Sequence, residues 1–177
     1  ARLVEQGVSP HRILLATFTN KAARFMLSRV ASLVTGDLRP LWGGTFHHLA
    51  NRTLRRHGRL LGYKPQFTIA DAEDARQLIH ACIAETSVAR QAEKFPKGDL
   101  LREVISLSVN TGQSRRDVVE QRYPFFSHLA EEIDRIAQAY EQRKRAQQIM
   151  DFDDLLVNWR MLLVEHPEMA DLYAERF

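Results

Sequence analysis

The fold is decided by one stretch of sequence, Ile13-Leu14-Leu15-Ala16-Thr17-Phe18-Thr19-Asn20-Lys21-Ala22-Ala23. It begins with a short, continuous apolar run, which is typical of a strand buried on both faces of a parallel sheet. A helix from about residue 20 to residue 34 is expected next, because Thr19 or Asn20 can cap its start and apolar residues continue at helical spacing. The stretch therefore predicts strand, loop and helix. A loop in that position is a common binding place for phosphate groups.

Phe18 stands between two threonines in the expected loop. A large aromatic side chain in such a place either fills the core or offers a flat surface on which a nucleic-acid base stacks. Sequence spacing alone leaves both interpretations open.

A second apolar run, residues 41–46, predicts a second strand. Its paired glycines, Gly43 and Gly44, indicate a close approach of the backbone to a neighbour or a ligand. Thr45 is expected to cap a helix that runs to about residue 61.

Four arginines share one face of this second helix: Arg52, Arg55, Arg56 and Arg59. They could follow a phosphate backbone or simply lie solvated at the surface, and both readings stay open. Residues 1–66 carry 11 Lys and Arg against two acidic residues, a net charge of +9, whereas residues 67–177 carry 14 against 20, a net charge of −6. This asymmetry indicates a polyanion-binding face in the first part, although solvated helix faces are also often basic.

Beyond residue 66 the pattern is almost entirely helical. The expected helices begin after Asp71, near Asp99, at Ser114, near Phe126, at Asp151 and at Pro167. The longest runs from residue 126 to about residue 148, roughly 35 Å at 1.5 Å per residue. Its apolar residues fall at alternating spacings of three and four: Phe126, Leu129, Ile133, Ile136 and Tyr140. A helix of this length could bridge between subdomains, and its stripe could instead dock a partner protein.

Groups with catalytic or metal-binding chemistry are few. Asp151, Asp153 and Asp154 form the one dense carboxylate group, which suits either a helix cap or a metal ion. His47 and His48 are adjacent, so they point apart on a helix, and no zinc-binding spacing surrounds them. No G-x-x-x-x-G-K-[ST] occurs, so the backbone loop and lysine that hold nucleotide phosphates are absent.

The composition is that of a soluble globular protein, with 45% hydrophobic and 27% charged residues. No apolar run approaches the roughly 20 residues that cross a bilayer, and no secretory signal is present. The single Cys82 has no partner cysteine in the chain, so we expect it in the core and the protein in a reducing, cytoplasmic setting.

Three motifs resemble those of one known family. Residues 17–23 resemble motif Ia of the UvrD/Rep/PcrA-type superfamily one DNA helicases, and residues 44–47 resemble their motif Ib. A third match, residues 150–156, resembles the segment by which the chain re-enters the first motor domain in that family. The three matches occur in the family's order.

The resemblance implies a mainly α protein with a small parallel β component, namely a partial RecA-like α/β motor subdomain with an inserted all-α subdomain. Residues 1–62 and 150–177 would form the motor part, and residues 63–149 the inserted helical part. In this family the Gly-rich ATP motif precedes motif Ia, and the acidic motif that holds magnesium follows the position of Phe177. The chain is therefore expected to be a fragment without catalytic residues of its own.

The implied function is that of the single-stranded DNA-tracking part of an ATP-dependent 3′-5′ DNA helicase, inactive alone. The parent protein would use ATP and magnesium and act in DNA repair or replication. Its partners would be single-stranded DNA and junctions of single and double strands, with no membrane partner. The DNA contacts implied by the motifs, with Arg55 added from the arginine face, are Phe18, Thr19, Asn20, Lys21, Thr45, Phe46, His47 and Arg55.

Two alternatives remain at this point: the helicase portion of a RecB/AddA-type helicase–nuclease, and a non-enzymatic helical module that docks a partner through the stripe at residues 126–140. Unpaired strand edges at residues 13–17 and 41–45 also suggest self-association of the fragment.

We expect the isolated chain not to hydrolyse ATP, because phosphoryl transfer needs phosphate-, magnesium- and water-positioning groups that its sequence does not contain. Phosphate release from a pure preparation, with and without a single-stranded oligonucleotide, measures this. Turnover stimulated by the oligonucleotide would contradict the fragment interpretation.

Overall fold

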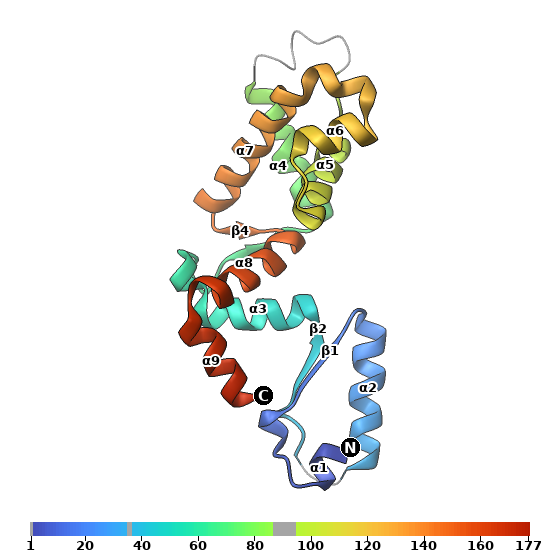
Figure 1. Cartoon of the computed structure of the whole chain (residues 1–177), viewed down its shortest axis with the longest axis vertical. Helices are drawn as coiled ribbons and strands as arrows, with labels where there is room; N and C mark the ends of the chain where they lie inside the picture. Colours follow the sequence, from blue (N-terminus) through green and yellow to red (C-terminus); the bar gives the residue numbers. More distant parts are fainter. Residues whose placement is uncertain (1, 35–36, 87–94) are drawn as a thin grey trace. The chain divides into compact units, whose positions relative to one another are not determined.

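The computed structural model describes residues 2–34, 37–86 and 95–177 (Figure 1). It confirms a mainly helical chain with a small parallel β component. The α-helices are α1 (Arg2–Glu5), α2 (Asn20–Leu33), α3 (Phe46–His57), α4 (Ala72–Glu85), α5 (Gly98–Thr111), α6 (Arg115–Arg122), α7 (Ala130–Ala146), α8 (Phe152–Glu165) and α9 (Pro167–Arg176). The strands are β1 (Leu14–Thr17), β2 (Trp42–Thr45), β3 (Thr68–Ile69) and β4 (Ile149–Met150), and short 3₁₀ helices are η1 (Pro10–Arg12), η2 (Gly58–Leu61) and η4 (Pro124–Leu129). None of the helices within these ranges is long and apolar enough to span a membrane.

The chain divides into two compact units. Unit 1 consists of residues 1–66 and 155–177, and unit 2 of residues 67–154. These division points lie near the subdomain boundaries predicted after residues 62 and 149. Those boundaries remain a prediction about separate domains.

Unit 1 is built on the parallel pair β1 and β2, which runs in register from Leu14 opposite Trp42 to Thr17 opposite Thr45. Each strand leads into a helix, α2 after β1 and α3 after β2, and both helices pack on the pair. Thr19 caps α2 and Thr45 caps α3, as predicted. The carboxyl ends of both strands and the first turns of both helices therefore meet at one edge of the sheet.

The strand β1 is less buried than the sequence predicts. Leu14 is 38% exposed, and of the four residues of β1 only Thr17 is buried. A strand covered on both faces needs helices on each side of a wider sheet, whereas in the described part of the chain β1 pairs with β2 alone. The expectation of burial on both faces was wrong for this reason.

The paired glycines of β2 do make the close approaches that the sequence indicates. A Cβ atom on Gly43 would stand 2.5 Å from Cδ2 of Leu27, and one on Gly44 would stand 2.6 Å from Cδ2 of His48. Both distances are shorter than van der Waals contact allows. The absence of a side chain at Gly43 and Gly44 therefore lets Leu27 of α2 and the ring of His48 lie directly against the strand.

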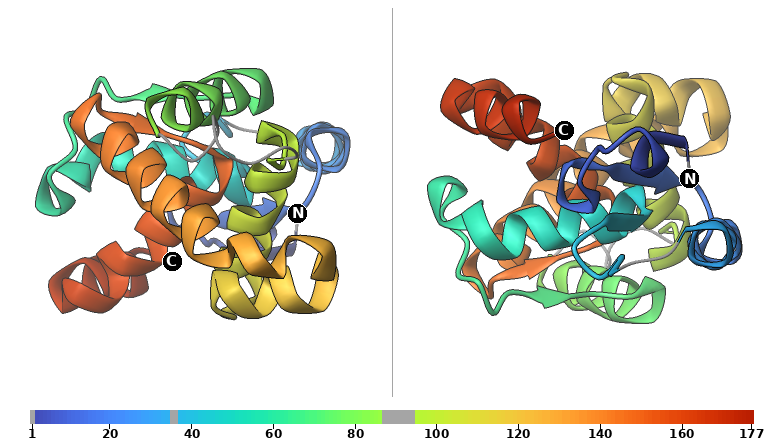
Figure 2. Two further views of the ribbon diagram at one scale, coloured as in Figure 1. Left: turned by 90° about the horizontal axis from the view of Figure 1, so that it is seen from above. Right: turned by 90° about the horizontal axis from the view of Figure 1, so that it is seen from below.

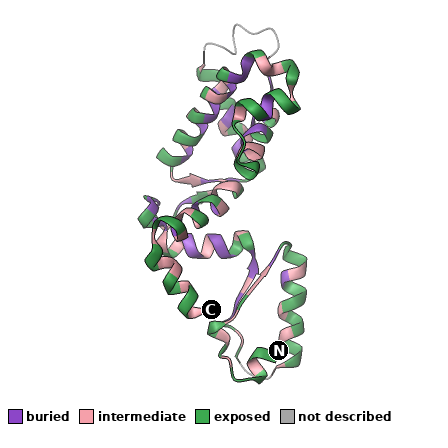
Figure 3. Cartoon of the chain, in the orientation of Figure 1, coloured by how far each residue is buried: buried purple, intermediate pink, exposed green. Residues whose placement is uncertain are grey.

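Unit 2 is a helical bundle in which α4, α5, α6 and α7 pack around one hydrophobic core (Figure 2). Buried residues, purple in Figure 3, lie on the facing sides of these helices. They include Cys82, as expected, and the α7 residues Ile133, Ile136 and Tyr140. The stripe that could have docked a partner protein therefore belongs to the core of unit 2.

The helix α7 is shorter than predicted. The chain forms the 3₁₀ helix η4 over Pro124–Leu129, and α7 begins only at Ala130. Side chains three residues apart share a face in both helix types, so the apolar spacing continues through η4 and the sequence does not mark the change. The 17 residues of α7 span about 25 Å at 1.5 Å per residue, not 35 Å.

A second parallel pair, β3 with β4, was not expected as a sheet. Thr68 lies opposite Ile149 and Ile69 opposite Met150, and this pairing joins the two ends of unit 2. Strands of two residues are too short to show a sequence period. Only the three-dimensional pairing reveals them.

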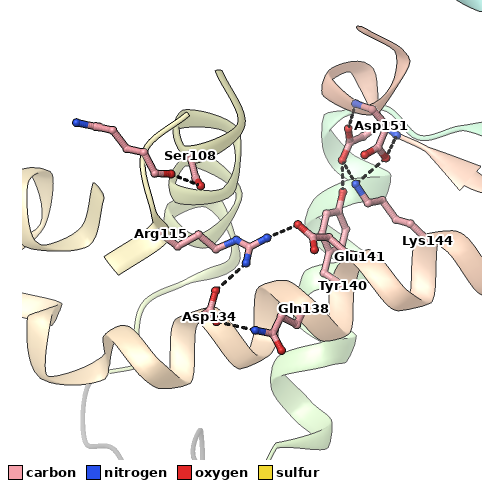
Figure 4. Close-up of polar contacts among 10 residues, drawn as sticks. Ser108, Arg115, Asp134, Gln138, Tyr140, Glu141, Lys144 and Asp151 are labelled. Atoms are coloured by element: carbon pink, nitrogen blue, oxygen red, sulfur yellow. Dashed lines mark hydrogen bonds and ion pairs between the residues drawn. The ribbon is translucent and has the colours of Figure 1, made fainter. Parts of the chain in front are cut away.

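A buried lysine holds the end of α7 to the start of α8 (Figure 4). The Lys144 side chain is 4% exposed, and its Nζ lies 2.6 Å from Oδ2 of Asp151 and 2.6 Å from Oδ2 of Asp154. The Tyr140 hydroxyl donates to Asp151 Oδ2 at 2.8 Å. The two aspartates also exchange hydrogen bonds between side chain and backbone N–H, at 2.9 and 3.0 Å.

These contacts show the structural role of Asp151 and Asp154. Asp151 and Asp154 cap the start of α8, which confirms the capping interpretation, and Lys144 neutralises them. Burial by itself would lower the pKa of Lys144, but the two carboxylates outweigh it and raise the pKa. Among the described residues no group of three or more side chains could hold a metal ion.

We expect Lys144→Met to destabilise the protein by about 3–5 kcal/mol, because it leaves Asp151 and Asp154 buried without a cation. Urea unfolding followed by circular dichroism measures this change. Lys97→Met, at an exposed lysine in the same unit, is the matched control and should change the free energy of unfolding by less than about 0.5 kcal/mol. Equal losses for the two variants would contradict the role given to Lys144.

Candidate nucleic-acid interface

Two aromatic rings lie next to each other at the sheet edge where β1 and β2 end. Phe18 follows β1 directly and Phe46 follows β2 directly, and their ring centroids are 5.4 Å apart with planes tilted by 48°. Phe18 is 90% exposed, so it does not fill the core. The Thr17 hydroxyl donates to the carbonyl oxygens of Thr19 and Gly44 at 3.1 and 3.4 Å, which ties the start of the loop to β2.

The two rings form one side of a pocket of about 610 Å³. Its lining is mostly apolar and combines residues that follow the strands with one face of α8: Phe18, Phe46, His47, Leu156, Trp159, Arg160, Leu163 and Val164. The sequence predicts that Leu156, Trp159 and Leu163 face inward with Leu155 and Leu162. Only Leu155 and Leu162 are in the core, whereas the other three line the pocket half-buried.

The sequence therefore missed the α8 wall of the pocket. Core-facing and pocket-facing residues form one continuous apolar stripe on α8, so their spacing carries no signal that separates them.

The polar residues of motifs Ia and Ib lie at two helix starts. Thr19 Oγ1 accepts a hydrogen bond from the Ala22 N–H at 3.1 Å, and Thr45 Oγ1 accepts one from the His48 N–H at 3.2 Å. Asn20 and Lys21 are exposed in the first turn of α2. The N–H groups of a first helical turn and the helix dipole both favour anions, so these two helix starts suit phosphate groups.

The arginine face of α3 is not one open surface. Arg55 is half-buried, and it donates to the Pro65 carbonyl at 2.7 Å and to Asn51 Oδ1 at 3.2 Å. Arg52 and Arg56 instead lie over the ring of Trp42, with Cζ 4.1 and 5.1 Å from its centroid. The structure therefore groups Phe18, Phe46 and His47 around one pocket and gives Arg55 a bond to the turn after η2. A DNA contact by Arg55 stays a prediction.

The sequence of the whole chain matches a known protein family. The family model described as the UvrD/REP helicase N-terminal domain matches residues 1–177. The chain belongs to the UvrD/REP helicase N-terminal domain family. This membership confirms the resemblance carried by residues 17–23, 44–47 and 150–156.

Curated relatives of this helicase domain include the ATP-dependent DNA helicases PcrA of Staphylococcus epidermidis and of Staphylococcus aureus strains Mu50 and NCTC 8325. Each is 29% identical to the chain over 175 residues. The match covers 99% of this chain and 23% of each relative. The helicase domain described here thus spans about a quarter of the length of these relatives.

We expect Phe18→Ala to change the free energy of unfolding by less than about 0.5 kcal/mol, because an exposed ring contributes little to the core. Leu49→Ala, at a fully buried residue of the same unit, should cost about 2–5 kcal/mol through the cavity it leaves. Urea unfolding of both variants measures the difference. A loss for Phe18→Ala as large as that for Leu49→Ala would restore the core interpretation of Phe18.

Proposed function

We propose that the chain is the single-stranded DNA-tracking part of an ATP-dependent DNA helicase that moves 3′ to 5′. The observation that carries this proposal is the exposed Phe18 ring, which lies beside Phe46 at the edge of a sheet between two helix starts. Every base has an aromatic face, so stacking on such a ring holds a single strand whatever its sequence. The proposed DNA contacts are Phe18, Thr19, Asn20, Lys21, Thr45, Phe46, His47 and Arg55.

These residues would make the two kinds of contact that single-strand binding requires, base stacking and phosphate binding. Phe18 and Phe46 offer the stacking surface, while Lys21 and the first turns of α2 and α3 offer positive charge and N–H donors to phosphate oxygens. Contacts of this kind hold the strand without reading its sequence, which suits a motor that must pass over any sequence. The proposed ligands are single strands and their junctions with duplex DNA.

We assign ATP and magnesium binding to other segments of the parent protein, because this chain contains no G-x-x-x-x-G-K-[ST] loop. The chain alone would bind single strands without turning over ATP. Relatives named ATP-dependent DNA helicase support the use of ATP by the parent.

Titration of a fluorescein-labelled dT oligonucleotide, followed by anisotropy at low salt, tests the proposal. Phe18→Ala should weaken binding by about 1–3 kcal/mol, which is roughly 5- to 150-fold, because one stacked base is lost. Phe25→Ala removes a similarly exposed ring from α2, outside the pocket, and is the matched control with no expected change. Lys21→Gln should reduce the slope of log K against log salt by about one.

Two results would overturn the proposal. One is the absence of single-strand binding by the unmodified chain at low salt. The other is an equal effect of Phe18→Ala and Phe25→Ala, since this would separate binding from the pocket.

A further inference from the structure

Trp42 on β2 is surrounded by positive charge. The residue is 1% exposed, and three guanidinium groups lie near its ring, with Cζ to centroid distances of 4.1 Å for Arg52, 4.6 Å for Arg176 and 5.1 Å for Arg56. Arg52 and Arg56 come from successive turns of α3, and Arg176 comes from the last turn of α9. We call Arg52, Arg56 and Arg176 the arginine triad.

The triad has no acidic partner within residues 2–34, 37–86 and 95–177. The ion pairs of this part of the chain include none of the three, and the one hydrogen bond of the triad goes from Arg176 Nε to the His11 carbonyl at 3.2 Å. Attraction between cations and the indole face holds each group near the ring. Three like charges at one ring nevertheless repel one another.

The pKa values of one triad member and of one neighbouring histidine are lowered. The pKa of Arg52 is lowered, first by burial and then by Arg56 and Arg176. The pKa of His57 is also lowered, first by burial and then by Arg56. The part of each shift that comes from the arginines shows that their charges disfavour further positive charge nearby, and such a field favours an anion.

The indole N–H supplies a second, independent observation. Nε1 of Trp42 is buried and has no acceptor in the described part of the chain. A buried donor without an acceptor is destabilising, and most such donors in folded proteins have one. Trp42 therefore adds a buried donor without an acceptor to the positive charge of the triad, and an oxyanion bound by the guanidinium groups would neutralise that charge.

We propose that the arginine triad is a phosphate-binding site built over Trp42. A guanidinium presents its N–H donors as a planar fork that matches phosphate oxygens, and a phosphate group has enough oxygens to accept from three arginines together. Arg56 is exposed and Arg52 and Arg176 are half-buried, so the site is open to solvent. The phosphate belongs either to a nucleic-acid backbone or to free phosphate or pyrophosphate.

This site is separate from the aromatic pocket. None of the triad residues, nor Trp42, lines the pocket of Phe18 and Phe46. The proposal therefore does not rest on the proposed function, and each can fail alone.

The fluorescence of Trp42 provides the readout. The chain has two tryptophans, so Trp159→Phe leaves Trp42 as the single emitter, in contact with the groups that would bind the anion. This variant is titrated with inorganic pyrophosphate, with a dT oligonucleotide and with polyglutamate, at low salt. Pyrophosphate or the oligonucleotide should change the emission saturably.

Further substitutions, each made in the Trp159→Phe protein, show where the ligand binds. Arg52→Gln and Arg56→Gln should each weaken phosphate binding at least about tenfold, because each removes a charge-assisted contact, and Arg52→Lys should lose less because it keeps the charge. Arg59→Gln, an exposed arginine just beyond α3, makes the same change in net charge and should cost less than about twofold. Circular dichroism checks that each variant folds. If Arg52→Gln does not fold, the test is the comparison of Arg56→Gln with Arg59→Gln, both at exposed arginines.

The ligands distinguish the sources of the phosphate. Saturation by pyrophosphate supports a free phosphate, whereas saturation by the oligonucleotide alone, retained in a protein that also carries Phe18→Ala, supports a backbone phosphate. A response to polyglutamate alone overturns the proposal in favour of an acidic partner protein. No response to any ligand, or equal weakening by Arg56→Gln and Arg59→Gln, overturns it as well.

Discussion

Parallel pairing of two four-residue strands fixes the candidate interface. Because Thr17 lies opposite Thr45, β1 and β2 end at the same level, and the aromatic residue after each strand leaves the sheet at the same edge. That register brings the ring centroids of Phe18 and Phe46 to 5.4 Å from each other. The two strands are far apart in the sequence, since Thr17 of β1 and Gly44 of β2 are 27 positions apart. A slip of one residue would turn every side chain of a strand to the opposite face and separate the rings.

The threonines next to these rings explain how an exposed phenylalanine is held in place. Thr45 and Thr19 use their hydroxyl oxygens to cap α3 and α2, so the backbone on the helix side of each ring is fixed. The Thr17 hydroxyl fixes the strand side of Phe18. An exposed aromatic side chain does not stabilise the core. A protein that fixes the backbone on both sides of such a residue has the feature expected at a binding site.

The chain places cations beside aromatic rings in two different ways. Lys144 is buried next to the Tyr140 ring, with Nζ 4.4 Å from the ring centroid, but two carboxylates neutralise it within unit 2. The arginine triad in unit 1 lies around Trp42, and no carboxylate of the described residues forms an ion pair with it. The first arrangement is complete in itself and fixes the start of α8. The second leaves positive charge that no ion pair of the described residues neutralises, which is why only the second suggests a ligand.

The sequence by itself determined the local structure: the strands at β1 and β2, the caps Thr19 and Thr45, the glycines that allow close packing, and the family. These features depend on residues near one another in the chain, so short patterns report them. Only the tertiary structure decided the burial of β1, the pairing of β3 with β4, the exposure of Phe18, the α8 wall of the pocket, the partners of Lys144 and the gathering of three arginines around Trp42. Each of these depends on contacts between residues far apart in sequence, and the spacing of residues along a chain does not specify which distant groups will meet.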